Sequence, residues 1–158
     1  MIFKILGCTV AVAASVIAAG AVVSAEKRRV TQLLAFASLT DRIGRLIDDF
    51  STPVSEILKS ADPDLLRSCG AQSPVTESFA AFLDSCDLAL NEEEKRVLFT
   101  FAADLGKRFR SEQVKVCTHC SGQLADFAND AHILFPKKRK MIYTLFICAA
   151  LALVVILI

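Results

Sequence analysis

Charge is absent from both ends of this 158-residue chain, and this feature constrains the fold most strongly. Residues 5–25 and 141–158 contain no Asp, Glu, Lys or Arg, whereas residues 26–140 contain 17 basic and 17 acidic side chains. A helix over 5–25 would be about 31 Å long, which matches a hydrocarbon core of about 30 Å. The 18 residues at 141–158 just reach the spanning range. The sequence therefore predicts two transmembrane helices.

Basic residues stand at the inner edges of both predicted spans. They are Lys27, Arg28, Arg29, Lys137, Lys138, Arg139 and Lys140, whereas Lys4 alone lies on an outer edge. Because membrane proteins keep Lys and Arg on the cytoplasmic side, we expect a cytoplasmic domain over 26–140 and an extracytoplasmic N-terminus over 1–4. The run at 137–140 also suits attraction to anionic lipid head groups. A nucleic-acid role for this run is disfavoured because a predicted span adjoins it.

A cleaved signal peptide is the alternative interpretation of residues 5–25. Lys4 supplies a short positive region, and Val23-Ser24-Ala25 fits a cleavage site after Ala25. Cleavage would leave an exported, tail-anchored module in which Cys117 and Cys120 form a redox or metal site. The bases directly after Ala25 oppose translocation, so we expect a retained span.

The part between the spans is predicted to be all-α, a helical bundle of about five or six helices. Strand-like alternation is rare, and apolar residues recur at three- and four-residue spacing. The first such stripe consists of Val30, Leu33, Leu34, Ala37, Ile43, Leu46, Ile47 and Phe50. This helix could continue directly from the first span. Thr52 then suits an N-cap, and Pro53 suits the first position of the next helix.

Further helices are marked by local signals. A helix is expected from about Thr76, with a buried stripe of Phe79, Phe82, Leu83 and Cys86. Asn91 and Glu94 form a capping-box pattern, and Gly106 suits a C-cap or a close helix crossing. A heptad-like stripe follows, widened by Cys120, Phe127 and Leu134: Val114, Cys117, Ser121, Leu124, Ala128, Ala131 and Phe135. Pro136 predicts a kink before the second span.

No motif in the sequence points to catalysis. Cys117-Thr-His-Cys120 is conspicuous, but it falls inside a predicted helix and on its apolar stripe, so we interpret both thiols as packing residues. Cys69 and Cys86 are the thiols that would complete a zinc set, although they form no second close pair. His119 and His132 are interpreted as surface or packing residues. We predict no catalytic, cofactor-binding or metal residue, and no enzyme.

The order of these features resembles the stage III sporulation protein AB family of endospore-forming bacteria. Thr52-Pro53-Val54 followed by Glu56-Ile57-Leu58 is similar to that family's T-P-L-x-E-A-L segment. The stretch Leu90–Leu98, which contains Glu94, is similar to its L-x-x-E-E-x-x-I-L segment, and Leu105, Gly106 and Gln113 match its L-G and Q positions. The chain departs from the family pattern at Phe79, where Trp is usual, and at Phe109 and Phe146.

This resemblance implies a function. It implies a non-enzymatic membrane platform of a channel between mother cell and forespore, in the mother-cell membrane around the forespore. It implies an all-α domain similar to the F-type domain of type II secretion machines, without cofactors. The implied partners are a cytoplasmic secretion-type ATPase and other membrane proteins of the channel. The residues that would contact these partners are not indicated by the sequence.

Overall fold

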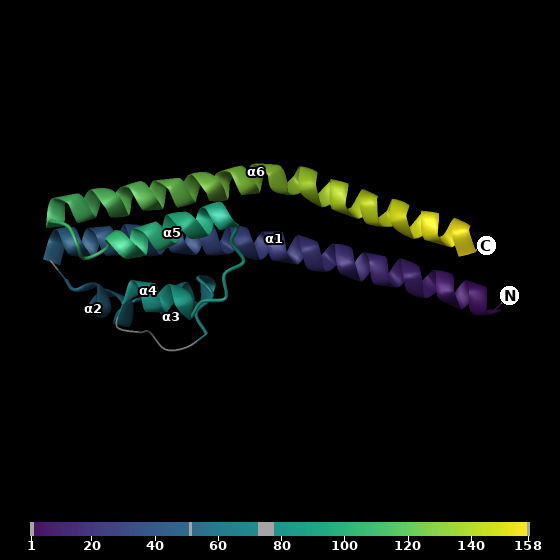
Figure 1. Cartoon of the computed structure of the whole chain (residues 1–158), viewed down its shortest axis with the longest axis horizontal. Coiled ribbons are helices and arrows are strands. Elements are labelled where there is room, and N and C mark those ends of the chain that lie inside the picture. Colours follow the sequence, from purple (N-terminus) through teal and green to yellow (C-terminus); the bar gives the residue numbers. More distant parts are fainter. Residues whose placement is uncertain (1, 51, 73–77, 158) are drawn as a thin grey trace. The chain divides into compact units, whose positions relative to one another are not determined.

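The computed structural model describes the backbone of residues 2–50, 52–72 and 78–157, and the side chains of residues 13–50, 52–72 and 78–152. This part of the chain forms helices and no strand, apart from an isolated antiparallel bridge between Ala71 and Cys86. The all-α prediction is therefore confirmed (Figure 1). The helices are α1 (Ile2–Phe50), α2 (Val54–Lys59), α3 (Pro63–Ser68), α4 (Phe79–Asp84), α5 (Glu92–Asp104) and α6 (Arg110–Leu157).

The chain divides into two compact units. The terminal unit contains residues 1–28 and 132–158, and the central unit contains residues 29–131. Both predicted spans are parts of longer helices, because 5–25 belongs to α1 and 141–157 belongs to α6. The expected continuation of the first span into the next helix is thus confirmed.

The described residues contain no helix with a stretch that is both long and apolar enough to cross a membrane. Each predicted span reaches beyond the described side chains. Residues 5–12 of the first and 153–158 of the second lie outside them.

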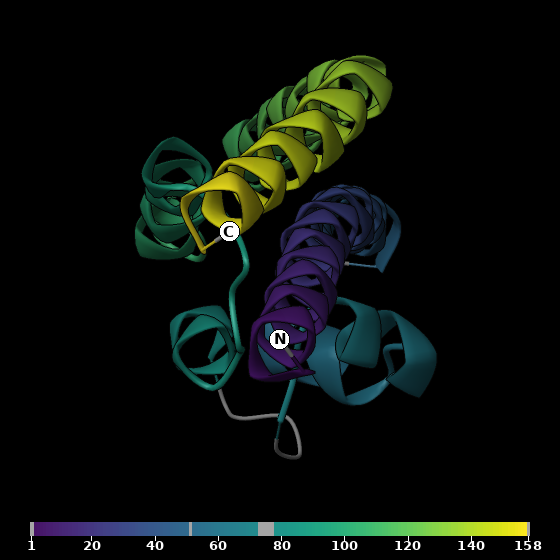
Figure 2. The same ribbon diagram turned by 90° about the vertical axis from the view of Figure 1, so that its right-hand side faces the viewer.

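Helix α1 lies in the middle of the central unit (Figure 2). Figures 1 and 2 show α6 on one side of α1 and the short helices α2, α3 and α4 on the other. Side chains on most faces of α1 are therefore buried, including Gln32, Leu33, Phe36, Leu39, Thr40 and Ile43. Two members of the predicted stripe are exposed, since Leu34 is 52% exposed and Phe50 at the helix end is 73% exposed. A helix covered on several faces has no single apolar stripe, so periodicity misplaced these two residues.

An aromatic cluster joins three helices in the core of the central unit. The Phe79 ring on α4 meets Phe101 of α5 edge-on, with ring centroids 5.2 Å apart. Phe82 lies 5.9 Å from Phe79 and 6.5 Å from Phe36 of α1. Edge-to-face pairs of this kind add about 0.5–1.5 kcal/mol each beyond the area they bury. Phe79, which stands where the resembling family usually has Trp, is thus a core residue.

The predicted caps are partly correct. Asn91 and Glu94 form the expected capping box at the start of α5. The cap at Thr52 is wrong by one residue, because α2 begins at Val54 and Pro53 occupies the N-cap position. The extended backbone of Pro53 turns its carbonyl toward the helix, where it accepts from the N–H groups of Glu56 and Ile57 at 3.0 and 3.1 Å.

The helix expected from about Thr76 is α4, which begins at Phe79 after an N-cap at Ser78. Thr76 itself lies outside the described residues. Cys86 is not on the buried stripe of α4, because the helix ends at Asp84. Gly106 follows the C-cap Leu105 with φ +85°, and a Cβ there would meet open space, so the C-cap interpretation is correct and the close crossing is wrong.

Helix α6 continues through Pro136. Its predicted stripe is buried at Cys117, Leu124, Ala128 and Ala131, whereas Leu134 is 47% exposed. The approach to α1 is close at Cys117, since a Cβ added to Gly44 would lie 2.9 Å from the Cys117 Cβ. Glycine at position 44 therefore permits the contact between the two long helices within the central unit.

Candidate functional site

Four residues that the family resemblance singled out line one hollow of the central unit, with a volume of about 270 Å³. Thr52 and Pro53 come from the α1–α2 connection, Gly106 from the α5–α6 connection, and Gln113 from the first turn of α6. Ile47, Val54 and Arg110 complete the lining. We call this the motif hollow. The structure thus brings together residues that lie up to 61 positions apart in the sequence.

Hydrogen bonds at the start of α6 shape the motif hollow. The Gln113 side chain donates from Nε2 to the Arg108 carbonyl at 3.0 Å, and its backbone N–H donates to the Phe109 carbonyl at 2.9 Å. Gly106 supplies the positive φ that the chain needs between two helices. Leu105 is half-buried against the core. These motif residues therefore build the α5–α6 connection. Phe109 belongs to the same connection, and its side chain is 84% exposed.

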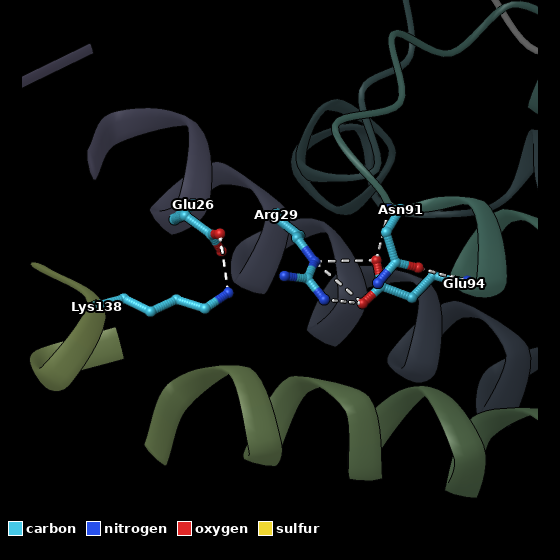
Figure 3. A network of polar contacts seen from close by, with 5 residues as sticks. All are labelled: Glu26, Arg29, Asn91, Glu94 and Lys138. Atoms are coloured by element: carbon cyan, nitrogen blue, oxygen red, sulfur yellow. Dashed lines mark hydrogen bonds and ion pairs between the residues drawn. The ribbon is translucent and has the colours of Figure 1, made fainter. Parts of the chain in front are cut away.

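Glu94 lies elsewhere, in a buried ion pair with Arg29 (Figure 3). Its side chain is completely buried, and Arg29 donates from Nε to both carboxylate oxygens at 3.0 Å and from Nη2 to Oε1. The same carboxylate accepts from the Asn91 backbone N–H at 2.8 Å. Glu94 therefore fixes the start of α5 to α1. This role for Arg29 was missed, because the sequence offered it only as one base in a run.

Gln32 is a second buried polar residue on α1, three positions after Arg29. Its Nε2 donates to the carbonyls of Asp87 and Cys69 at 2.7 and 3.4 Å, and its Oε1 accepts from the Ala89 N–H at 2.8 Å. Gln32 thereby pairs backbone groups of the α4–α5 connection and of the end of α3. The sequence signal of this role is a lone amide in an apolar run.

The seven predicted topology residues fall on both sides of the boundary between the two units. Arg29 belongs to the central unit, and the other six belong to the terminal unit. Lys138 forms an ion pair with Glu26, with Nζ 3.1 Å from Oε1 (Figure 3). Lys137, Arg139 and Lys140 are exposed. Their role in orienting the chain stays a prediction.

The cysteines of the central unit are buried or half-buried and form no disulfide. Burial raises the pKa of Cys117 to about 11 and that of Cys120 to about 12. Burial also raises the pKa of Cys86 to about 11, and raises that of Cys69 further. Metal binding and thiol exchange both require the thiolate, which these surroundings disfavour. Across the residues described, no three or more His, Cys, Asp or Glu side chains gather in a way that could hold a metal ion.

The free energy of unfolding should therefore fall in alkaline solution through these thiols. The folded chain holds the protons of Cys117 and Cys120 more tightly than the unfolded chain does. The contribution of these two thiols to the free energy of unfolding is therefore complete below pH 9 and is lost as pH rises through about 11 to 12. Denaturant unfolding across this pH range is the measurement. The variant with both cysteines changed to alanine should lose less stability than the wild type over the same range, and equal losses would contradict the prediction.

A groove of about 670 Å³ runs between α5 and α6 within the central unit. Val97, Phe101, Val116 and Cys120 supply its apolar lining. Its polar and charged lining consists of Glu93, Arg96, Thr100, Asp104, Lys115, His119 and Gln123. From Glu93 to Asp104 the α5 side is about 16 Å long, the length of about three helical turns. We call this the α5–α6 groove. Its size and mixed chemistry suit a helix from another protein.

Comparison with known proteins identifies one family. The sequence model of the family described as stage III sporulation protein AB matches residues 4–158, which is nearly the whole chain. No curated protein and no solved structure matches. The match confirms the resemblance found in the sequence and supports a role in sporulation.

Proposed function

The chain belongs to the stage III sporulation protein AB family, and from this premise we propose that it is a non-enzymatic membrane platform of a sporulation channel. Two transmembrane helices, over 5–25 and 141–158, would hold the body of the chain on the cytoplasmic face of the mother-cell membrane around the forespore. Both termini would lie on the opposite side. The platform would dock a cytoplasmic secretion-type ATPase, which hydrolyses ATP, and other membrane proteins of the channel. Tethering partners to one membrane raises their effective concentration, so modest contacts suffice.

Exposed apolar side chains of the terminal unit are the observation that supports this proposal. Described residues of both long helices present them: Val16, Ile17, Val22, Met141, Leu145, Ile147 and Leu151, each at least 42% exposed. Such a surface is unfavourable in water and favourable against lipid or another apolar surface. Basic side chains follow at the inner ends of the same segments, as expected where a helix leaves the bilayer on the cytoplasmic side.

The α5–α6 groove is the surface that we assign to the ATPase contact. Its α5 side carries Glu93, Arg96 and Asp104, and its α6 side carries the basic Lys115. A partner helix with an apolar stripe, charges of both signs along one edge and an acidic residue along the other would complement this pattern. The contact would then consist of an apolar centre with a charged rim, an arrangement found in protein interfaces.

Co-purification of the full chain with the cognate ATPase from detergent-solubilised membranes tests the proposal. We expect the wild-type chain to retain the ATPase and Thr100→Trp, in the groove, to lose it because the indole fills the space for the partner helix. Thr118→Trp is the matched control, since Thr118 is exposed on α6 but does not line the groove. Failure of the wild type to retain the ATPase would contradict the platform function. Retention by Thr100→Trp would contradict only the assigned surface.

A further inference from the structure

A second hollow, of about 480 Å³, lies along one face of α6 within the terminal unit. Its lining residues all come from this helix: Phe135, Pro136, Arg139, Lys140, Tyr143, Thr144 and Ile147. Successive members are separated by alternating steps of one and three residues, which keeps them on one side of an α-helix. We call this the cationic hollow. It is distinct from the motif hollow and from the α5–α6 groove, both of which belong to the central unit.

The side chains that line the cationic hollow change in character from one end to the other. Two cations, Arg139 and Lys140, are followed one turn later by the hydroxyls of Tyr143 and Thr144, and then by Ile147. Exposed apolar residues continue beyond it, with Ile147 52% exposed and Leu151 58% exposed. The distance along the helix from Arg139 to Leu151 is about 18 Å. Positive charge, hydrogen-bonding groups and apolar surface therefore succeed one another, as the parts of an amphiphilic anion would require.

No ion pair neutralises Arg139 or Lys140 among the side chains that the structure describes. The terminal unit has one acidic residue in its sequence, Glu26, and Lys138 is paired with it. Across the described side chains, the structure pairs neither Arg139 nor Lys140 with an acid. Thr144 donates its hydroxyl proton to the Lys140 carbonyl at 2.9 Å, so it does not donate to a ligand. Arg139, Lys140 and Tyr143 line the hollow, and a guanidinium, an ammonium and a phenolic hydroxyl are together donors that suit a phosphate.

We propose that the cationic hollow binds the phosphate of an anionic glycerophospholipid, with the acyl chains lying along the apolar residues that follow Tyr143. A free phosphate ion offers the same charge but makes no use of Ile147 and Leu151. The lipid gains from both, because each CH₂ removed from water contributes about 0.8 kcal/mol. The inference rests on the membrane location in the proposed function, but it does not depend on the ATPase. It adds a lipid requirement that the platform function does not include.

Tyr143 makes the proposal measurable, because it is the one tyrosine of the chain and there is no tryptophan. The tyrosine fluorescence of the full chain therefore reports on the cationic hollow itself. The chain, held in a nonionic detergent, is titrated with short-chain phosphatidylglycerol, with short-chain phosphatidylcholine, and with inorganic phosphate. We expect a saturable change in fluorescence with phosphatidylglycerol, at a concentration at least about tenfold below that needed with the other two, which corresponds to about 1.4 kcal/mol.

Two charge-neutralising variants distinguish a specific binding site from non-specific electrostatic attraction. Arg139→Gln should weaken the phosphatidylglycerol response at least about tenfold, as expected for loss of a charge-assisted contact. Lys137→Gln is the matched control, because Lys137 is an exposed cation of the same run that does not line the hollow, and its response should stay close to wild type. Circular dichroism should show unchanged helix content in both variants.

Three results would overturn the proposal. Equal responses to phosphatidylglycerol and phosphatidylcholine would remove the need for an anion, and an equal response to inorganic phosphate would make this a free-phosphate site. Equal losses in Arg139→Gln and Lys137→Gln would reduce it to diffuse attraction. The platform function is judged separately, because a chain that responds to phosphatidylglycerol but does not retain the ATPase would contradict that function alone.

Discussion

Replacing Glu94 with glutamine is expected to lower the free energy of unfolding of the central unit by about 3–5 kcal/mol, because it removes the buried carboxylate that Arg29 contacts through both oxygens. The Glu94 side chain is completely buried and the Arg29 side chain is 18% exposed, so the pair is largely shielded from water. Denaturant unfolding of the detergent-solubilised chain, followed by circular dichroism, gives the value. Glu93→Gln removes the neighbouring, exposed carboxylate and should cost less than about 1 kcal/mol.

A double variant tests the cause of this loss. If the loss of the carboxylate beside Arg29 is responsible, then Arg29→Met combined with Glu94→Gln should recover part of the stability, since removing both charges is often close to neutral. The double variant would instead be less stable than Glu94→Gln if the arginine contributed independently of its partner. That result, or a loss below about 1 kcal/mol in Glu94→Gln itself, would contradict the role we give to the pair.

Gly70→Ala is expected to destabilise the central unit by a similar amount, about 3–5 kcal/mol. Gly70 has φ +96°, which costs a residue with a side chain about 1–2 kcal/mol. The added Cβ would also lie 2.6 Å from Nε2 of Gln32 and 2.7 Å from the Asp87 carbonyl oxygen. The Gln32 amide would have to move, and its hydrogen bonds to the α4–α5 connection would be lost, at about 0.5–1.5 kcal/mol for each.

Gly106→Ala is the control for this prediction. Gly106 has a similar φ of +85°, but a Cβ there would meet no atom within 4 Å. Its substitution should therefore show the backbone strain alone, about 1–2 kcal/mol, and thermal or denaturant unfolding compares the two variants directly. Equal losses at positions 70 and 106 would mean that the contact of Gly70 with Gln32 has no energetic importance.

The features that the sequence predicted well are those that depend on near neighbours. The capping box of Asn91 and Glu94 involves residues three positions apart, and the end of α5 is marked by Gly106 itself. The all-α class follows in the same way from apolar spacing along each helix. The residues that form each of these signals lie within one or two helical turns of one another.

The features that the sequence did not predict depend on residues far apart in the chain. Arg29 and Glu94 are 65 positions apart, and nothing beside Arg29 indicates a buried partner. The exposure of Leu34 and Phe50 could not be foreseen, because α1 is covered on several faces and its apolar residues do not form a single stripe. In the sequence, the cationic hollow was visible only as a run of bases. The structure shows that Arg139 and Lys140 are the members of that run that line the hollow.

Labelling of single cysteines from the two sides of the membrane tests the central claim most directly. In a chain without native cysteines, Ile2→Cys, Ser60→Cys or Ile158→Cys is introduced. The chain is produced in non-sporulating cells, where the far side of its membrane faces the medium, and the intact cells are treated with a membrane-impermeant maleimide. Ser60 is exposed at the end of α2, so the reagent can reach it if it shares its compartment. The platform function predicts labelling at positions 2 and 158 in intact cells, and labelling at position 60 only after permeabilisation. Labelling of position 60 in intact cells would place the helical body outside the cytoplasm and contradict the platform function.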